Sequence, residues 1–398
     1  MPKKLRNTEK LLVAAPLLGV AVLYLWPRVR ERLTVPNFQP RLTIGLPAKE
    51  ETYGVTLSPD ARFIVTASVA KNGNAGCVRV LDGHTGFDWH TFVDSSRYGM
   101  GSVAISPDSR LVAFAVDKTT IWNPDTGKRL RVLDKARLEG TVFSLAYGGE
   151  AVFAPDNRTL ALSGQGTRLW DTTTGRFKGL ATQPKGLRFG ARSNELRPSF
   201  SYPRFSPDGK EIACLFTYHK PSSGLAPHPD NFRIQIWDVA SRKRKSIVPI
   251  EAVNHFAWSP DGRRIVIICG KWDKQNDTTR TELTLYDLKT SRVVWTKTHT
   301  WKDARGKAQA YWLSRVAWSP NGRWLVASNG IGGINVSNVA TGDLRLTLKP
   351  LPKRNAGGIF SASLCFSADG KTLLSARPHE IYLWDFEEIA RYLEQMPS

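Results

Sequence analysis

The sequence predicts an all-β protein: a seven-bladed β-propeller of four-stranded antiparallel blades, with an N-terminal transmembrane helix and a short C-terminal helix. The first observation is a turn of the type Ser-Pro-Asp-Gly that recurs along the chain. Ser and Asp bond the local backbone, Pro presets φ, and Gly tolerates the exit geometry. The copies begin at Ser58, Ser106, Ala154, Ser206, Ser259, Ser319 and Ser367.

The spacing of these turns is the second observation. Successive copies are 48, 48, 52, 53, 60 and 48 residues apart, and a nearly constant period of this size indicates a repeat architecture. Apolar runs rich in Val, Ile, Phe and Trp flank each turn, which is typical of a β-hairpin. The run after the turn is often wholly apolar, as in a strand that is buried on both faces.

An aromatic residue followed by Asp or Asn closes the third strand of each repeat, and this is the third observation. Clear instances are Trp122-Asn123, Trp170-Asp171, Trp237-Asp238, Tyr286-Asp287 and Trp384-Asp385, and weaker ones are Leu81-Asp82 and Ser337-Asn338. Four of these lead into a second turn that ends in Gly, at 82–86, 123–127, 171–175 and 338–342. Each repeat therefore holds two hairpins, or four strands.

The recurring Ser-Pro-Asp-Gly turn and the aromatic residue followed by Asp or Asn together resemble the repeats of the WD-repeat β-propeller family. The resemblance covers residues 41–385. The Gly-His dipeptide that usually opens a WD repeat is missing, so the chain resembles the divergent, bacterial-type members. Repetition of the Asp and aromatic positions indicates a structural role in turns and blades. These positions are Asp60, Asp108, Trp122, Asp156, Trp170, Asp171, Asp208, Trp237, Asp238, Asp261, Asp287, Trp384 and Asp385.

The last repeat lacks an outer strand, because residues 386–398 change to helical spacing, with Ile389, Tyr392, Leu393 and Met396 on one face. The β-patterned segment at 41–46 precedes the first repeat, and we expect it to supply the missing strand and close the ring. The alternative is an unclosed ring with a stray strand.

The N-terminus contains a candidate membrane anchor. A basic tail at 1–10 precedes residues 11–26, "LLVAAPLLGVAVLYLW", which carry no charge and as a helix would span about 24 Å. A Pro/Arg-rich linker at 27–40 follows. We expect a single-pass transmembrane helix. The alternatives are a cleaved signal peptide and a peripheral or buried helix.

The side of the membrane is poorly determined by charge. Four basic residues precede the segment (Lys3, Lys4, Arg6, Lys10) and four follow it (Arg28, Arg30, Arg32, Arg41). The short N-terminal tail favours an N-in orientation, which would place the propeller outside the cytoplasm.

Positive charge is the main compositional anomaly, with a formal net charge of +21. Insertions at 219–232 and 271–281, and blade connections at 181–199, 298–315 and 349–358, all fall on one rim of the predicted ring. Basic and aromatic residues are mixed in them, as in protein-binding surfaces. The candidate partner-binding rim comprises Lys185, Arg188, Arg192, Arg197, Lys271, Trp272, Trp301, Lys302, Arg305, Lys307, Tyr311, Trp312, Lys353 and Arg354.

A plainer alternative is that long surface loops are polar and that this chain is basic throughout. The stretch "SRKRKS" at 241–246, expected on the opposite rim, shows that bias.

No recognised catalytic motif is present: there is no GxSxG, HExxH, phosphate loop or dinucleotide fingerprint. We therefore predict no enzyme activity and no catalytic, cofactor-binding or metal-binding residues. His219 and His228 share one insertion, but a loop histidine is usually solvated. The four cysteines lack zinc-site spacing and are expected to be free thiols.

The favoured function is a membrane-anchored, monomeric propeller that acts as a scaffold for protein–protein interaction through its basic, aromatic rim. One alternative is a propeller enzyme or small-ligand binder that uses the central channel, which requires a convergent set of polar groups there. Another is a basic platform on an anionic membrane or polymer, with steep salt dependence. Nucleic acid is not favoured, because no nucleic-acid-binding module is visible.

Overall fold

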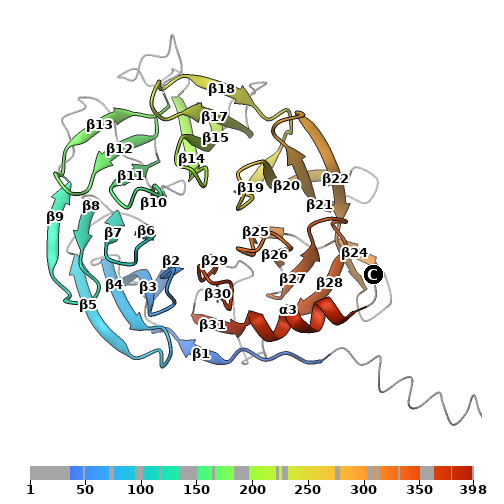
Figure 1. The fold of residues 1–398 in the computed structure, drawn as a ribbon, viewed down its shortest axis with the longest axis horizontal. Coiled ribbons are helices and arrows are strands. Elements are labelled where there is room, and N and C mark those ends of the chain that lie inside the picture. Colours follow the sequence, from blue (N-terminus) through green and yellow to red (C-terminus); the bar gives the residue numbers. More distant parts are fainter. Residues whose placement is uncertain are drawn as a thin grey trace, which may run out of the picture. The chain divides into compact units, whose positions relative to one another are not determined.

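A computed structural model describes residues 36–47, 50–70, 76–94, 102–115, 119–133, 150–163, 166–182, 197–220, 224–225, 232–273, 278–302, 308–310, 313–329, 332–349, 363–377 and 379–396. Within these residues the strands form seven antiparallel blades around an axis (Figure 1), which confirms the predicted propeller. Each blade has four strands, which in blades one to six lie in sequence order from the axis outward. Blade seven takes its outermost strand from the start of the described chain, and blade four carries an additional short strand.

Blades one to three follow one another along the chain. Their strands are β2 (Glu50–Leu57), β3 (Phe63–Ala70), β4 (Gly76–Asp82) and β5 (Asp88–Asp94); β6 (Ser102–Ile105), β7 (Val112–Ala115), β8 (Thr119–Trp122) and β9 (Arg129–Leu133); and β10 (Ala151–Phe153), β11 (Thr159–Leu162), β12 (Arg168–Asp171) and β13 (Phe177–Leu180).

Blades four and five contain the longest strands. Blade four has β14 (Arg197–Phe205), β15 (Glu211–Lys220), β17 (Arg233–Asp238) and β18 (Arg244–Ile247), with the extra strand β16 (Gly224–Leu225) paired to β15. Blade five has β19 (Val253–Trp258), β20 (Arg264–Asp273), β21 (Thr278–Asp287) and β22 (Arg292–Thr298).

A separate hairpin lies between blades five and six. It consists of β23 (Thr300–Lys302) and β24 (Ala308–Ala310). Blade six has β25 (Leu313–Trp318), β26 (Trp324–Asn329), β27 (Ile334–Asn338) and β28 (Leu344–Leu348), and blade seven has β29 (Ser363–Phe366), β30 (Thr372–Arg377) and β31 (Glu380–Asp385).

The fourth strand of blade seven comes from the start of the described chain. β1 (Leu42–Gly45) pairs antiparallel with β31, with Leu42 opposite Leu383 and Ile44 opposite Ile381. Leu42 and Ile44 pack against the core between blades seven and one. The ring is thus closed by strands from the two ends of one sequence, which leaves β31 no unpaired edge.

The C-terminal helix is also confirmed, as α3 (Phe386–Gln395). The side chain of Asp385, which ends β31, accepts a hydrogen bond from the backbone N–H of Glu388 and caps the helix. Phe386, Ile389 and Leu393 are buried, so α3 lies against the ring by its apolar face.

Both faces of each blade are buried against neighbouring blades. In β20, Ile265 and Ile267 pack into the core shared with blade four, whereas Val266 and Ile268 pack into the core shared with blade six. Alternate side chains of a strand point to opposite faces, so this strand must be apolar throughout. The wholly apolar runs in the sequence follow from that requirement.

The repeated turn has the same geometry in every blade. Its fourth residue has a positive φ throughout, whether it is glycine, as at Gly262 (φ 70°), or not, as at Ala61 (φ 59°), Ser109 (φ 61°) and Asn157 (φ 59°). In blade five the Ser259 hydroxyl donates to Asp261 Oδ1 at 2.6 Å and accepts from the backbone N–H of Arg264 at 2.9 Å. The serine and the aspartate therefore fold the turn together.

The predicted anchor at residues 11–26 lies outside the described residues. In the part of the chain that the structure describes, no helix has both the length and the apolar composition needed to cross a bilayer.

Candidate functional site

The two rims of the ring carry different connections. We call the rim with the repeated Ser-Pro-Asp turns the turn rim. The connection rim is the opposite one, where second strands end, third strands begin and blades are linked. Five predicted rim residues have described backbone, and all five belong to the connection rim: Arg197 begins β14, Lys271 and Trp272 lie in β20, and Trp301 and Lys302 lie in β23.

The other nine predicted rim residues lie outside the described residues. They are Lys185, Arg188, Arg192, Arg305, Lys307, Tyr311, Trp312, Lys353 and Arg354. His228 also lies outside them, whereas His219 is in β15.

The insertion at 271–281 is largely strand rather than loop. β20 and β21 are ten residues each, and their pairing continues to Lys271 opposite Arg280 and Trp272 opposite Thr279. The corresponding strands of blade two have four residues each. β24 lies against β21, so the lengthened hairpin of blade five and the β23–β24 hairpin form one raised part of the connection rim.

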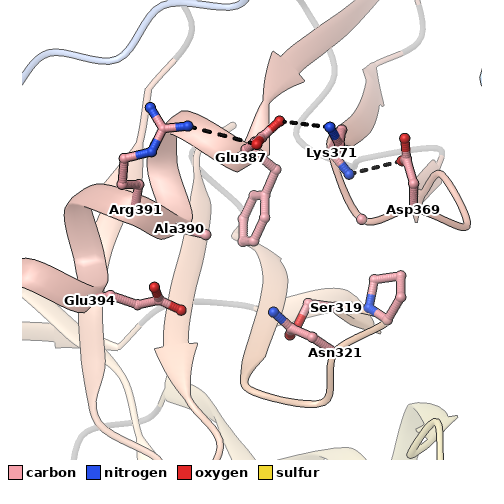
Figure 2. A pocket seen from close by; sticks show the side chains of 11 residues that line it. Ser319, Asn321, Asp369, Lys371, Glu387, Ala390, Arg391 and Glu394 are labelled. Atoms are coloured by element: carbon pink, nitrogen blue, oxygen red, sulfur yellow. Dashed lines mark hydrogen bonds and ion pairs between the residues drawn. The ribbon is translucent and has the colours of Figure 1, made fainter.

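On the turn rim, a groove of about 330 Å³ separates α3 from the repeated turns of blades six and seven (Figure 2). Four of its charged side chains form ion pairs within the groove or at its edge. Glu387 pairs with Lys371 at 3.2 Å and with Arg391 at 3.7 Å, and Glu394 pairs with Arg323 at 2.7 Å. Exposed pairs of this kind contribute little to stability. Asp369, which also lines the groove, accepts hydrogen bonds from the Ser367 hydroxyl and from the backbone N–H of Lys371.

The innermost strands carry a third candidate site. Four residues before each repeated turn, one residue per blade occupies the same register position on the strand nearest the axis. Blades seven, one and two have glycine or serine there, whereas blades three to six have large polar side chains. In blade order from one to seven these residues are Gly54, Ser102, Glu150, Tyr202, His255, Arg315 and Ser363.

The large side chains of this layer contact one another. The Arg315 guanidinium lies over the Tyr202 ring, 5.1 Å from its centroid, and the His255 ring meets the edge of Tyr202 with centroids 5.5 Å apart. Arg315 is on blade six and Tyr202 on blade four, so they must meet on the axial side of β19 in blade five. Arg204, two residues after Tyr202, contacts Glu150 through Nη1 and Oε2 at 2.5 Å.

We call these five residues the inner cluster: Glu150, Tyr202, Arg204, His255 and Arg315. The cluster holds more positive than negative charge. Glu150 is the carboxylate of the cluster, and the two arginines are cations. The side chains of Glu150 and Arg204 are 21% and 28% exposed, so the cluster reaches solvent at this ion pair, whereas His255 is buried.

The protonation states follow from burial and from the neighbouring charges. Desolvation by burial, together with the charges of Arg315 and Arg204, lowers the pKa of His255 well below its ordinary value. His255 Nδ1 lies 3.3 Å from the backbone N–H of Val316 and accepts its hydrogen bond, which leaves the ring proton on Nε2. Desolvation lowers the pKa of Arg315, but Glu150 and Tyr202 outweigh it and raise the pKa above its ordinary value.

Backbone irregularities mark the same layer. The pairing of β14 with β15 skips from Ser201 to Arg204, and similar shifts precede His255 in β19, Arg315 in β25 and Gly54 in β2. These are β-bulges, which redirect side chains and are common beside functional sites. Tyr202 also has a φ of 51°, which for a bulky residue costs about 1–2 kcal/mol.

Sequence reasoning missed the inner cluster, because the residues at the shared register position, Glu150, Tyr202, His255 and Arg315, are of four different types. The signal that would have found them is register: each of the four layer residues lies four positions before a repeated turn that the sequence displays.

The four cysteines are free, three of them buried and Cys365 half-buried. Among the described residues, no three His, Cys, Asp or Glu side chains are close enough together to hold a metal ion. The sequence matches no model of a known protein family and no curated protein. The class of the protein therefore follows from its fold: it is a seven-bladed β-propeller.

Proposed function

We propose that this chain is a divergent WD-repeat propeller that binds a partner protein through the connection rim of blades four to six, and that residues 11–26 tether it to a membrane. The β-propeller fold is commonly a scaffold for protein interaction. The observation that carries the proposal is the raised part of the rim, where ten-residue strands and an additional hairpin coincide with the basic and aromatic positions of the sequence.

The raised part suits protein binding because its backbone is paired strand. A binding surface on hydrogen-bonded strands loses less conformational entropy on association than one on long loops. Its sequence supplies Trp272 and Trp301 beside Lys271 and Lys302, and Trp and Arg, with Tyr, dominate the energetics of most protein interfaces.

Site-specific photo-crosslinking in intact membranes tests the proposal. A photoreactive amino acid at Trp272 or at Trp301 should capture the same partner protein. The control position is Lys243, an exposed residue of the turn rim in the equally basic stretch 241–246. Equal capture from Lys243, or different proteins from positions 272 and 301, would contradict a dedicated binding surface.

Salt dependence distinguishes this proposal from the alternative of a basic platform on an anionic membrane or polymer. An interface centred on aromatic residues should weaken only slightly between low and moderate salt, whereas attachment to an anionic membrane or polymer should weaken steeply. The Trp272→Ala variant should reduce capture more than Lys271→Gln does. The reverse order would favour the basic platform.

The membrane tether has its own test. Extraction of membranes at alkaline pH should leave the chain in the pellet, and deletion of residues 11–26 should release it. A reporter fused after Ser398 then shows which side of the membrane the propeller occupies.

A further inference from the structure

We propose that the inner cluster is a binding site for a small organic anion, held by its carboxylate group between Arg315, Tyr202 and Arg204. This site lies on the axial strands and is independent of the connection rim. Four successive blades contribute to it, whereas the other three blades place only glycine or serine at the same level. The polar groups are therefore gathered on one side of the axis.

Backbone strain at Tyr202 is the first argument. A tyrosine with φ 51° at a β-bulge adopts a conformation that bulky residues rarely take, and such strain is concentrated at ligand sites. Pro203 follows it and has no N–H to offer to the β14–β15 ladder. The bulge turns the Tyr202 ring toward Arg315 and His255, which contact it from blades six and five.

The charge balance is the second argument. Glu150 makes its ion pair with Arg204, and among the described residues no carboxylate lies within ion-pair distance of Arg315. A guanidinium stacked on an aromatic ring keeps its edge N–H groups available. Those groups match the two oxygens of a carboxylate, which is the geometry that arginine recognises best.

The neighbours of Arg315 define the rest of the site. His255 is neutral and its Nε2 carries the proton, so it does not add a second charge. The Ser328 hydroxyl, on β26, accepts a hydrogen bond from the backbone N–H of Arg315 at 3.1 Å. This bond holds the bulge in the neighbouring strand β25. The Trp258 indole donates to the carbonyl of Arg204 at 3.0 Å. These contacts fix the backbone from which both arginines project.

Titration calorimetry on the full-length chain tests the site, with succinate and acetate as probes and chloride and inorganic phosphate as comparison anions at constant ionic strength. Succinate should bind saturably. It should also move the imidazole NMR signal of His255, assigned through the His255→Asn variant, because a bound anion offsets the field of Arg315 on that ring.

Three variants show whether the binding is specific. Arg315→Met should weaken succinate binding by at least about tenfold, the loss of one charge-assisted contact. Arg110→Met, which removes an exposed arginine of the turn rim, should change it by less than about twofold. Glu150→Gln should tighten it by about threefold or more, since it removes a competing carboxylate from the cluster.

Each remaining outcome overturns the proposal. Absence of saturable binding by either carboxylate excludes the site. Equal weakening by Arg315→Met and Arg110→Met means that succinate responds only to general surface charge. Binding of phosphate alone means that the carboxylate class is wrong. Circular dichroism of each variant shows whether the fold is intact, and the opposite direction expected for Glu150→Gln cannot arise from misfolding.

Discussion

Replacement of Ser259 by alanine tests whether the serine hydroxyl, and not the aspartate alone, organises the repeated turn. The hydroxyl is buried, donates to Asp261 and accepts from the backbone N–H of Arg264. Loss of the acceptor for a buried N–H costs about 1–3 kcal/mol. The bond to the exposed Asp261 carboxylate is screened by solvent and adds at most about 1 kcal/mol. We expect a total loss near 2 kcal/mol.

The assay is thermal and urea unfolding followed by tryptophan fluorescence. For a ring of about 345 residues, the unfolding entropy scales to about 0.7 kcal/mol per kelvin, so the midpoint should fall by about 3 °C. A loss below about 0.5 kcal/mol, the range of an ordinary surface substitution, would refute the role of the hydroxyl.

A second variant in blade five uses the turn of blade three as its template. There Ala154 replaces the serine, and Thr159 compensates: its N–H and its hydroxyl both donate to Asp156, at 2.7 and 2.6 Å. Adding Arg264→Thr to Ser259→Ala should therefore restore about 1 kcal/mol. If the double variant is less stable than Ser259→Ala, the compensation is wrong.

Three further predictions concern closure, backbone strain and pH. Ile44→Asp should destabilise the ring by about 3 kcal/mol or more, since it places a carboxylate in the core between blades seven and one. The control is Thr43→Asp, at an exposed position of the same strand, which should change the urea midpoint little. Equal effects of the two variants would contradict closure by β1. Ser291→Gly should raise the free energy of unfolding by up to about 1 kcal/mol, and with it the urea midpoint, because Ser291 has φ 54° where four other blades have glycine. A lower midpoint would contradict strain there. Hydrogen bonding to Arg79 lowers the pKa of Glu50. The pair therefore stabilises the fold at pH values above the unfolded-state pKa of glutamate, and this contribution disappears as the pH falls through the lower folded-state pKa. Glu50→Gln should therefore flatten the acid side of the stability–pH curve, and an unchanged acid side would show that the pair is not coupled to folding.

The repeat itself was readable from the sequence because its turns have strict local chemistry. A few adjacent residues specify this turn: Pro at the second position, an Asp that accepts backbone N–H groups, and a fourth residue in the left-handed conformation. The second turn shows the limit of this reasoning. Arg242 and Ser291 take the left-handed conformation there without glycine, so the sequence showed glycine in only four blades.

The candidate rim was predictable only as a location. Strand order within a blade determines which connections share a rim, and the turns determine the strand order, so the five described residues of the connection rim could be assigned to one face in advance. How the insertions fold could not be predicted, because no local turn motif announces the pairing of Lys271 with Arg280 across β20 and β21 or the packing of β24 against β21.

The sequence by itself determined the number of blades, the four-stranded unit and the helical end of the chain, since each depends on contacts between residues near in sequence. Only the tertiary structure decided that Glu150, Tyr202, Arg204, His255 and Arg315 form one cluster. They come from four blades, about 50 residues apart, and no local pattern links them. Ring closure brings them together, because it places the same register position of every blade at the same level around one axis.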